Sequence, residues 1–288
     1  MNITPSDLPA GFQFSQSVLQ DFTDCPRRFY LRYIRRLAWP ALETEPALES
    51  EHFIQQGEVF HRVAHQFFLG IPVESMGKSV QEEPLSSWWA NLLQSIDQMP
   101  EFKQPASRRH PEFILSAPWE DYRLIAKYDL LLVNPDQSIL IFDWKTYRRR
   151  PRRPWLQGRM QTLIYPFLLA LAGQEAKLTI DIHPEQISLI YWFANFPTTP
   201  EVFTYSARQF QADHGKLSRM VKNIRDLAAK HDQEAFQMTT EVNRCLYCNY
   251  RSLCDRGVRA GDLPETAEET PDLDLLDASL EQIAEIEY

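Results

Sequence analysis

The stretch at residues 139–154, ILIFDWKTYRRRPRRP, places two unlike chemistries side by side. Its first half is apolar, as expected of a buried strand, and it ends in Asp143, Trp144 and Lys145. Side chains two positions apart on a strand share a face, so Asp143 and Lys145 project together while Trp144 faces away. A run of arginines follows at once: Arg148, Arg149, Arg150, Arg152 and Arg153. We therefore expect a carboxylate and an amine at a strand end, beside a cationic loop.

The preceding strand supplies a second carboxylate. Residues 122–133, YRLIAKYDLLLV, predict a strand that contains Asp129, and the turn signal NPD follows it. A three-residue loop would pair residue 133 with residue 139 and set Asp129 opposite Asp143. Two facing carboxylates repel each other unless a divalent cation such as Mg²⁺ binds between them. Taken alone, however, an Asp-x-Lys pair is more often an ion pair at the protein surface.

Two predicted helices carry polar residues at a spacing of four. Gly57 and His61 share one face of a helix at 55–69, where a small residue lies one turn from an imidazole. A second helix, at 155–173 and bent by Pro166, carries three polar side chains on one stripe behind the strand: Gln157, Gln161 and Tyr165. A lone histidine on such a helix is usually structural, but here it joins an ordered series.

The order Gly-x3-His, Asp, Asp-x-Lys and Gln-x3-Tyr resembles the RecB-like branch of the PD-(D/E)xK nuclease superfamily. It is also similar to the CRISPR-associated adaptation nucleases that share these motifs. The match covers about residues 55–170. The resemblance implies that His61, Asp129 and Asp143 bind the metal and that Lys145 is catalytic.

The same resemblance implies supporting roles around this site. Gln161 and Tyr165, with Gln157 on the same stripe, are expected to support the site and the path of the DNA. One position departs from the family pattern, because Ala126 stands where glycine is common, three residues before the second-motif aspartate. This substitution is mild and should leave the chemistry intact.

The four cysteines are divided between the two ends of the chain. Cys25 stands alone, whereas Cys245, Cys248 and Cys254 form a C-x2-C-x5-C group. Four thiolates suit an iron–sulfur cluster or a tetrahedral zinc ion, although zinc usually takes two close C-x2-C pairs. The arrangement, with the run FSQSVLQDFTDCPRRFYLRY around Cys25, resembles the iron–sulfur staple of RecB-like nucleases. That resemblance implies a 4Fe–4S cluster that ties the first helix to the C-terminal segment.

The arginine run is expected to be a stiff loop, because Pro151 and Pro154 interrupt it. Beside a metal and a lysine, such a loop would hold phosphates without reading base sequence. Tyr147 and Trp155 border the loop and fit two alternatives equally, stacking on unpaired bases or packing in the core. Arginines of the first helix fit either a second cationic patch or a solvent-facing surface: Arg27, Arg28, Arg32, Arg35 and Arg36.

Charge and composition set the remaining bounds. The chain is 44% hydrophobic and 24% charged, as in an ordinary globular protein. Residues 261–288 hold ten Asp and Glu and no Lys or Arg, so the formal net charge of −9 becomes +1 without them. The acidic pI therefore does not exclude a nucleic-acid partner. No apolar run reaches the roughly 18 residues of a membrane span and no signal peptide is recognisable, so we expect a cytoplasmic protein without a membrane partner.

The order of elements predicts an α/β fold. Helices come first, followed by strands at 112–119, 122–133 and 138–146, a helix, strands at 185–195 and 201–206, and a long helix at 207–231. We expect a restriction-endonuclease-like core, a small mixed sheet flanked by helices, with N- and C-terminal segments joined by the four-cysteine cluster. The expected domains are an N-terminal helix at 1–50, the nuclease core at 51–235, the cysteine segment at 236–260 and an acidic tail at 261–288.

These expectations describe a metal-dependent deoxyribonuclease that uses Mg²⁺ or Mn²⁺ and holds a 4Fe–4S cluster, with zinc as the alternative occupant. Analogy with the family and the arginine loop favour an exonuclease acting on single-stranded or frayed DNA ends. A helicase, or a CRISPR or repair protein, is the expected partner. The main alternative is a non-catalytic DNA-binding or scaffold protein that keeps the nuclease fold. A zinc-stabilised interaction protein that uses its acidic tail is a third.

Overall fold

The computed structural model describes residues 8–9, 11–37, 45–76, 80–104, 107–172, 182–246 and 248–257. The expected acidic tail lies outside the described residues. Within the described ranges, strands form one six-stranded sheet: β1 (Gln13–Phe14), β2 (Arg108–Trp119), β3 (Tyr122–Val133), β4 (Ile139–Lys145), β5 (Ile187–Phe193) and β6 (Glu201–Thr204).

The sheet is mixed, and β3 is its central strand. β1 runs parallel to β3 and β4 parallel to β5, while the pairs β2–β3, β3–β4 and β5–β6 are antiparallel. β2 pairs with one side of β3 along almost its whole length. On the other side, β1 pairs with β3 as far as Leu124, and β4 pairs with it from Leu130 onward. A fork therefore opens between β1 and β4 along residues 125–129, which we call the β3 fork.

Helices connect and cover these strands: α1 (Gln16–Asp24), α2 (Pro26–Phe29), α3 (Glu45–Phe68), α4 (Val73–Met76), α5 (Leu85–Gln98), α6 (Arg153–Gly158), α7 (Met160–Ala172) and α8 (Ala207–Ala228). A π-helical turn, Tyr30–Ile34, continues α2. Short 3₁₀ turns add to them: Pro100–Lys103, Pro184–Gln186, Gln233–Ala235, Val242–Cys245 and Arg251–Cys254. Among the described residues, no helix has the length and apolar character needed to cross a membrane.

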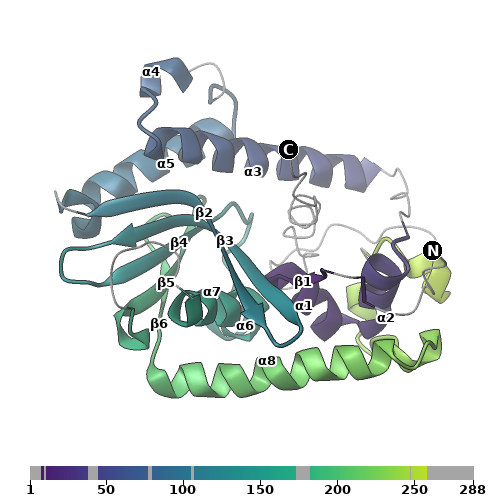
Figure 1. The fold of residues 1–288 in the computed structure, drawn as a ribbon. Helices are drawn as coiled ribbons and strands as arrows, with labels where there is room; N and C mark the ends of the chain where they lie inside the picture. Colours follow the sequence, from purple (N-terminus) through teal and green to yellow (C-terminus); the bar gives the residue numbers. More distant parts are fainter. Residues whose placement is uncertain are drawn as a thin grey trace, which may run out of the picture.

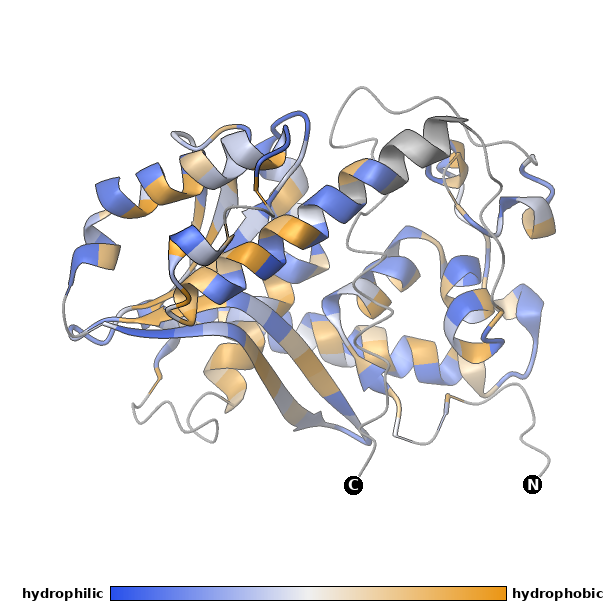
Figure 2. Cartoon of the chain, turned by 90° about the horizontal axis from the view of Figure 1, so that it is seen from above, coloured by the Kyte–Doolittle hydropathy of each residue, from blue (hydrophilic) through white to orange (hydrophobic). Residues whose placement is uncertain are grey.

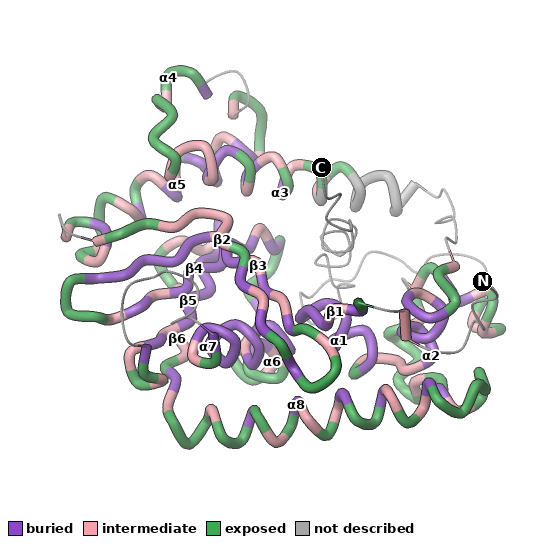
Figure 3. Tube along the Cα trace, viewed as in Figure 1, coloured by how far each residue is buried: buried purple, intermediate pink, exposed green. Residues whose placement is uncertain are grey.

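Helices lie on both faces of the sheet (Figure 1). α3 and α5 cover one face, where Phe60 of α3 stacks on Trp192 of β5 with ring centroids 6.1 Å apart. α1, α6, α7 and α8 lie on the opposite side, where Phe167 of α7 is fully buried. Hydrophobic residues gather where strands and helices meet (Figure 2), and the buried residues concentrate in the same places (Figure 3). The predicted fold class, a mixed sheet flanked by helices, is confirmed.

Two predicted helices are interrupted. The first expected helix begins after Ser15, whose hydroxyl accepts a hydrogen bond from the Val18 N–H, but it breaks at Cys25, whose backbone is extended. The helix expected at 155–173 was predicted to bend at Pro166, whereas the break separates α6 from α7 at Arg159. Arg159 is extended because the next N–H, that of Met160, bonds to a side chain of α1 instead of continuing α6.

Candidate active site

The β3 fork places one carboxylate between two strands. The predicted pairing of Val133 with Ile139 is confirmed, and the ladder between β3 and β4 continues as far as Leu130 and Phe142. At the next position of β3 a side chain replaces the backbone as the acceptor, because Asp129 Oδ2 accepts the backbone N–H of Trp144 at 2.7 Å. Asp129 is therefore anchored in the plane of the sheet at the point where β3 and β4 separate.

The backbone is irregular at the same point. A regular strand keeps its even-numbered side chains on one face, yet Tyr128 belongs to the core cluster around α1 and α7 while Leu130 belongs to the cluster under α3 and α5. On β2 the pairing steps over Glu112, which has a φ of +50°. The side chains of β2 and β3 thus switch between the two faces of the sheet at the same point. Glu112 and Asp129 lie at that point, where the regular alternation of side chains is interrupted.

Three groups capable of binding a metal meet beside the fork. His61 of α3, Glu112 of β2 and Asp129 of β3 each offer a ligand atom, and these atoms all lie within 4.8 Å of one another. His61 Nδ1 lies 3.2 Å from Asp129 Oδ1. All three side chains are half-buried, so an ion could reach them from solvent. One imidazole and two carboxylates form a donor set that suits a divalent cation, so these residues fit such a metal. Glu112 is the third member of the group, whereas the third ligand that the resemblance implied is Asp143.

The two carboxylates of this group influence each other. Burial and the charge of Asp129 raise the pKa of Glu112, against the opposing effect of Lys127, which forms an ion pair with it. Burial also raises the pKa of Asp129, but His61, the Trp144 N–H and Lys145 together outweigh it, so the Asp129 pKa lies below its usual value. Two carboxylates are thus held close together, which is the repulsive situation that a cation relieves.

Asp143 and Lys145 lie on the same side of β4, as alternation predicts. Lys145 Nζ is 3.0 Å from Asp143 Oδ2, and both side chains are buried. Gln161 of α7 donates from Nε2 to Asp143 Oδ1 at 2.5 Å. The Lys145 ammonium also lies over the rings of Tyr147 and Tyr191, at 5.9 and 5.8 Å from their centroids. Both charged groups are therefore fixed in position by buried partners.

Trp144 faces away from them and stacks on Phe68 of α3, with ring centroids 5.9 Å apart. Gly57, one turn before His61, also faces β4. A Cβ atom on Gly57 would meet the Thr146 hydroxyl at 3.0 Å, so a glycine allows α3 to lie this close to the end of the strand. The Gly-x3-His spacing therefore serves a close approach that brings His61 to Asp129.

The comparison with known families follows from this arrangement. The sequence profile described as the PD-(D/E)XK nuclease superfamily matches residues 13–255. The chain belongs to this superfamily. No curated protein matches the sequence. Among solved structures, SSO0001 is similar with a TM-score of 0.39 and 13% identity, covering 85% of this chain and 87% of that one. An exonuclease candidate from Eubacterium rectale is similar with a TM-score of 0.43 and 9% identity, covering 77% and 82%.

The predicted glutamine stripe of this PD-(D/E)XK chain is only partly assembled. Gln157 is exposed on α6, because the break at Arg159 separates it from the other two residues. Gln161 and Tyr165 share α7 and are both buried. The Tyr165 carbonyl accepts the hydroxyl hydrogen bond of Tyr128 at 3.0 Å. The expectation that Gln157 shares one stripe with the other two was wrong, because that expectation assumed one continuous helix.

The arginine loop is exposed but partly neutralised. Arg150 and Arg153 both form ion pairs with Glu201 of β6. Arg148 lies over the ring of Phe53, 4.6 Å from its centroid, and Arg149 and Arg152 are also exposed. The loop therefore has an acidic partner on β6 that sequence spacing did not indicate.

Other cationic and aromatic residues are used internally. For the arginines of the first helix a second cationic patch and a solvent-facing surface were both open, and neither holds for Arg27 and Arg28, which are buried. Arg28 Nη2 lies 2.8 Å from Asp21 Oδ1. Tyr147 is buried in the core, which favours packing over base stacking for that residue. Trp155 packs against the same core.

The four cysteines, although far apart in sequence, line one pocket together with Arg28, Arg251 and Arg256. All four are free thiols. Burial raises the pKa of the Cys248 thiol to about 11, while the nearby Arg28 charge lowers it. Burial likewise raises the pKa of the Cys245 and Cys254 thiols, and the Arg256 charge opposes it only in part.

Glu112 is the site residue that sequence reasoning missed, although a signal for it was present. Trp119 and Tyr122 flank a two-residue hairpin turn and pair with each other. Counting back along both strands from that pair sets Glu112 opposite Asp129. The same counting that was applied to β3 and β4 would have found it.

Proposed function

We propose that this member of the PD-(D/E)XK nuclease superfamily is a metal-dependent deoxyribonuclease whose active site lies at the β3 fork. One observation carries the proposal. The ligand atoms of His61, Glu112 and Asp129 lie within 4.8 Å of one another, and Asp129 is hydrogen-bonded to the strand residue between Asp143 and Lys145. A metal-binding group, a third carboxylate and an amine therefore belong to one connected unit.

In this proposal His61, Asp129 and Asp143 hold Mg²⁺ or Mn²⁺, and Glu112 is available as a further carboxylate ligand. A divalent ion supplies charge to the scissile phosphate and lowers the pKa of a bound water. Lys145, oriented by Asp143 and by the faces of Tyr147 and Tyr191, places a fixed positive charge beside the phosphate. Gln161 holds Asp143 from the opposite side.

The substrate proposed is DNA with single-stranded or frayed ends, cut as an exonuclease cuts. Support comes from the exposed arginine loop, where Arg148, Arg149 and Arg152 would contact phosphates without reading bases. We place the chain in the RecB-like branch, near the CRISPR-associated adaptation nucleases, on the motif order. A helicase, or a CRISPR or repair protein, is the partner this placement favours.

We assign a 4Fe–4S cluster to Cys25, Cys245, Cys248 and Cys254. Their convergence on one pocket, with three arginines lining it, fits a cluster that carries net negative charge. Zinc is the other occupant that four thiolates accept. Iron, sulfide and zinc analysis of protein purified without oxygen separates the two, because the cluster predicts about four irons per chain and a brown colour, and zinc predicts a colourless protein.

The activity is tested with end-labelled single- and double-stranded DNA, with and without Mn²⁺. Asp143→Asn and Lys145→Met should each lower the cleavage rate by about 10²-fold or more, the loss expected when one electrostatic group of an active site is removed. Asp97→Asn is the matched control, because this exposed carboxylate of α5 makes only a 4.0 Å contact with Lys103. Each variant must keep the metal content of the cysteine site and the Tm of the wild type, so that a lower rate is not caused by unfolding.

The second candidate is a DNA-binding or scaffold protein without catalysis. The neutralisation of Arg150 and Arg153 by Glu201 does not favour it, because a protein that only bound DNA would gain from leaving these charges unpaired. It predicts DNA binding by the wild-type chain without cleavage at any Mn²⁺ concentration. Cleavage that survives unchanged in Asp143→Asn would also refute the proposed active site.

A further inference from the structure

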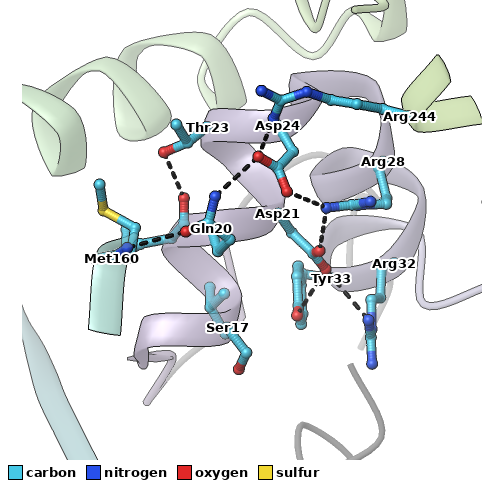
Figure 4. A network of polar contacts seen from close by, with 12 residues as sticks. Ser17, Gln20, Asp21, Thr23, Asp24, Arg28, Arg32, Tyr33, Met160 and Arg244 are labelled. Atoms are coloured by element: carbon cyan, nitrogen blue, oxygen red, sulfur yellow. Dashed lines mark hydrogen bonds and ion pairs between the residues drawn. The ribbon is translucent and has the colours of Figure 1, made fainter. Parts of the chain in front are cut away.

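A buried polar contact joins the first helix to the active-site strand through α7. Gln20 of α1 is 6% exposed, and its Oε1 accepts the backbone N–H of Met160 at 2.9 Å (Figure 4). Met160 is the first residue of α7, and the preceding Arg159 is extended. The first N–H groups of a helix have no acceptor within the helix, so Gln20 satisfies a donor that burial would otherwise leave unpaired.

The residue after Met160 is Gln161, which holds Asp143. Gln161 lies in the first turn of α7, and fraying of that turn would move its side chain. The hydrogen bond from Met160 to Gln20 therefore fixes the turn from which Gln161 reaches the Asp143 carboxylate. Residues that orient a ligand from outside the direct contact shell change activity by about 10- to 100-fold when they are removed.

Gln20 is itself held in one orientation. Its Nε2 donates to Asp24 Oδ1 at 2.8 Å, one turn along α1. Asp24 also accepts from Arg28 and from Arg244, which precedes the cluster residue Cys245 in sequence (Figure 4). The network therefore runs from the cysteine segment through α1 to α7.

We infer that Gln20 is a positioning residue for the active site, which acts by fixing the first turn of α7 so that Gln161 holds Asp143. This inference rests on the proposed nuclease function for its kinetic consequence, but its structural step is independent of that function. It assigns to α1 a role in positioning the active site beyond leading to Cys25.

Three variants test it. Gln20→Met keeps the length of the side chain and removes both polar groups, while Gln20→Glu keeps an acceptor for the Met160 N–H. Thr23→Val is the matched control, because the Thr23 hydroxyl bonds only to the Leu19 carbonyl within α1 and to a sulfur of α8, not to α7. Gln20→Met should lower kcat by about tenfold with KM for DNA unchanged, and Gln20→Glu should recover only part of the loss, because its carboxylate accepts the Met160 N–H but cannot donate to Asp24.

Two further readouts separate positioning from a general loss of stability. Hydrogen exchange at the Met160 amide should become faster in Gln20→Met and remain unchanged in Thr23→Val. In a double-mutant cycle, Gln20→Met should cause little further loss when Gln161→Met is already present, because both changes act on the same contact. Additive losses, an unchanged Met160 amide, or an equal effect of Thr23→Val would each overturn the inference.

The outcome remains distinct from that of the proposed function. If the wild-type chain does not cut DNA, the proposed activity fails, and the positioning of Asp143 is then judged from amide exchange and from Mn²⁺ affinity measured by calorimetry. Gln20→Met should weaken Mn²⁺ binding in that case too. If Gln20→Met leaves both the Mn²⁺ affinity and the hydrogen exchange of the Met160 amide unchanged, the positioning inference is refuted independently of the proposed activity.

Discussion

At the scale of single residues, the site depends on side chains whose positions are set by other elements. Asp129 is fixed by His61 of α3 and by the Trp144 N–H of β4, so its carboxylate is held between two elements remote in sequence. His61 in turn reaches Asp129 because Gly57 lets α3 approach the end of β4. A substitution of Gly57 should therefore change the cleavage rate more than the Tm.

Gly57→Ala adds a methyl group that meets the Thr146 hydroxyl at 3.0 Å. The alanine gains about 1 kcal/mol of helix propensity, which offsets much of the cost of the contact, so the Tm should change little. The contact should displace the residue after Lys145, and the cleavage rate should fall. Adding Thr146→Ala removes the obstructing hydroxyl and should restore the rate. A fall that persists in the double variant would contradict this explanation.

Asp213 of α8 gives a pH prediction that concerns stability alone. It is buried, it accepts the Tyr205 hydroxyl at 3.0 Å and the Gln209 amide at 2.8 Å, and burial raises its pKa. A raised pKa means that the folded state binds the proton more tightly than the unfolded state. This carboxyl therefore makes stability decrease as pH rises from its unfolded pKa of 3.8 through the folded value.

Asp213→Asn removes this pH dependence while keeping an oxygen for Gln209. The free energy of unfolding of the variant minus that of the wild type should be larger at pH 7 than at pH 4, so the variant is relatively more stable at pH 7; urea denaturation at both values measures it. An equal difference at the two pH values would show that the carboxyl does not titrate in this way.

At the scale of elements, β6 controls the charge of the arginine loop. Glu201 binds Arg150 and Arg153, yet each arginine also donates to a backbone carbonyl, of Thr199 and Val202 respectively. The loop therefore has two kinds of anchor, of which only the carboxylate reduces its positive charge. Removing that charge should leave the position of the loop largely unchanged.

Glu201→Gln should tighten DNA binding, because two guanidinium groups lose their counter-charge while their carbonyl contacts remain. The slope of log affinity against log salt concentration should become steeper by about 1, as expected for an added phosphate contact. Fluorescence anisotropy with labelled single-stranded DNA measures both quantities. Glu120→Gln, in the exposed turn between β2 and β3, is the charge-matched control. Equal effects in the two variants would mean that only net charge matters.

At the scale of the whole molecule, the N- and C-terminal segments are held together by protein contacts that do not depend on the cluster proposed for the cysteine site. Phe236 is 1% exposed and packs against Tyr30, with ring centroids 5.0 Å apart. Arg27 donates to the Phe236 carbonyl from Nε at 2.8 Å and to the Gln237 carbonyl from its backbone N–H at 3.2 Å. Figure 1 shows the C-terminal segment beside α1 and α2. The segment is thus anchored up to residue 237 without any metal.

Removing the metal proposed for the cysteine site should loosen the segment after residue 237 most. The contacts that remain there include the Tyr250 hydroxyl to the Leu37 carbonyl at 2.8 Å and the ion pair of Arg244 with Asp24. We expect the Tm to fall by more than about 5 °C, because a cross-link between distant parts of the chain restricts the unfolded state. Limited proteolysis should begin between residues 238 and 257, while the sheet and α8 stay intact. Protection of this segment in the metal-free protein, or cleavage throughout the chain, would contradict the expected division.

The sequence predicted those features of the fold and site that depend on local spacing. Alternation placed Asp143 and Lys145 on one side of β4 and Trp144 on the other, and loop length gave the Val133–Ile139 register. Both follow from the two-residue period of a strand and from the reach of a short turn. The superfamily followed from the order of motifs, and the matching profile confirms it. The functional roles of these residues stay predictions.

The tertiary structure alone decided which distant partners these residues meet. Glu112 joins His61 and Asp129 because β2 and β3 change face together, and no local period records such a change. The helix after the arginine loop breaks at Arg159 because the N–H of Met160 bonds to the side chain of Gln20, which lies 140 positions earlier in the chain. Glu201 neutralises two arginines from the neighbouring edge of the sheet. Spacing along a chain fixes the face on which a side chain lies, whereas its partner is fixed by packing between elements that are remote in sequence.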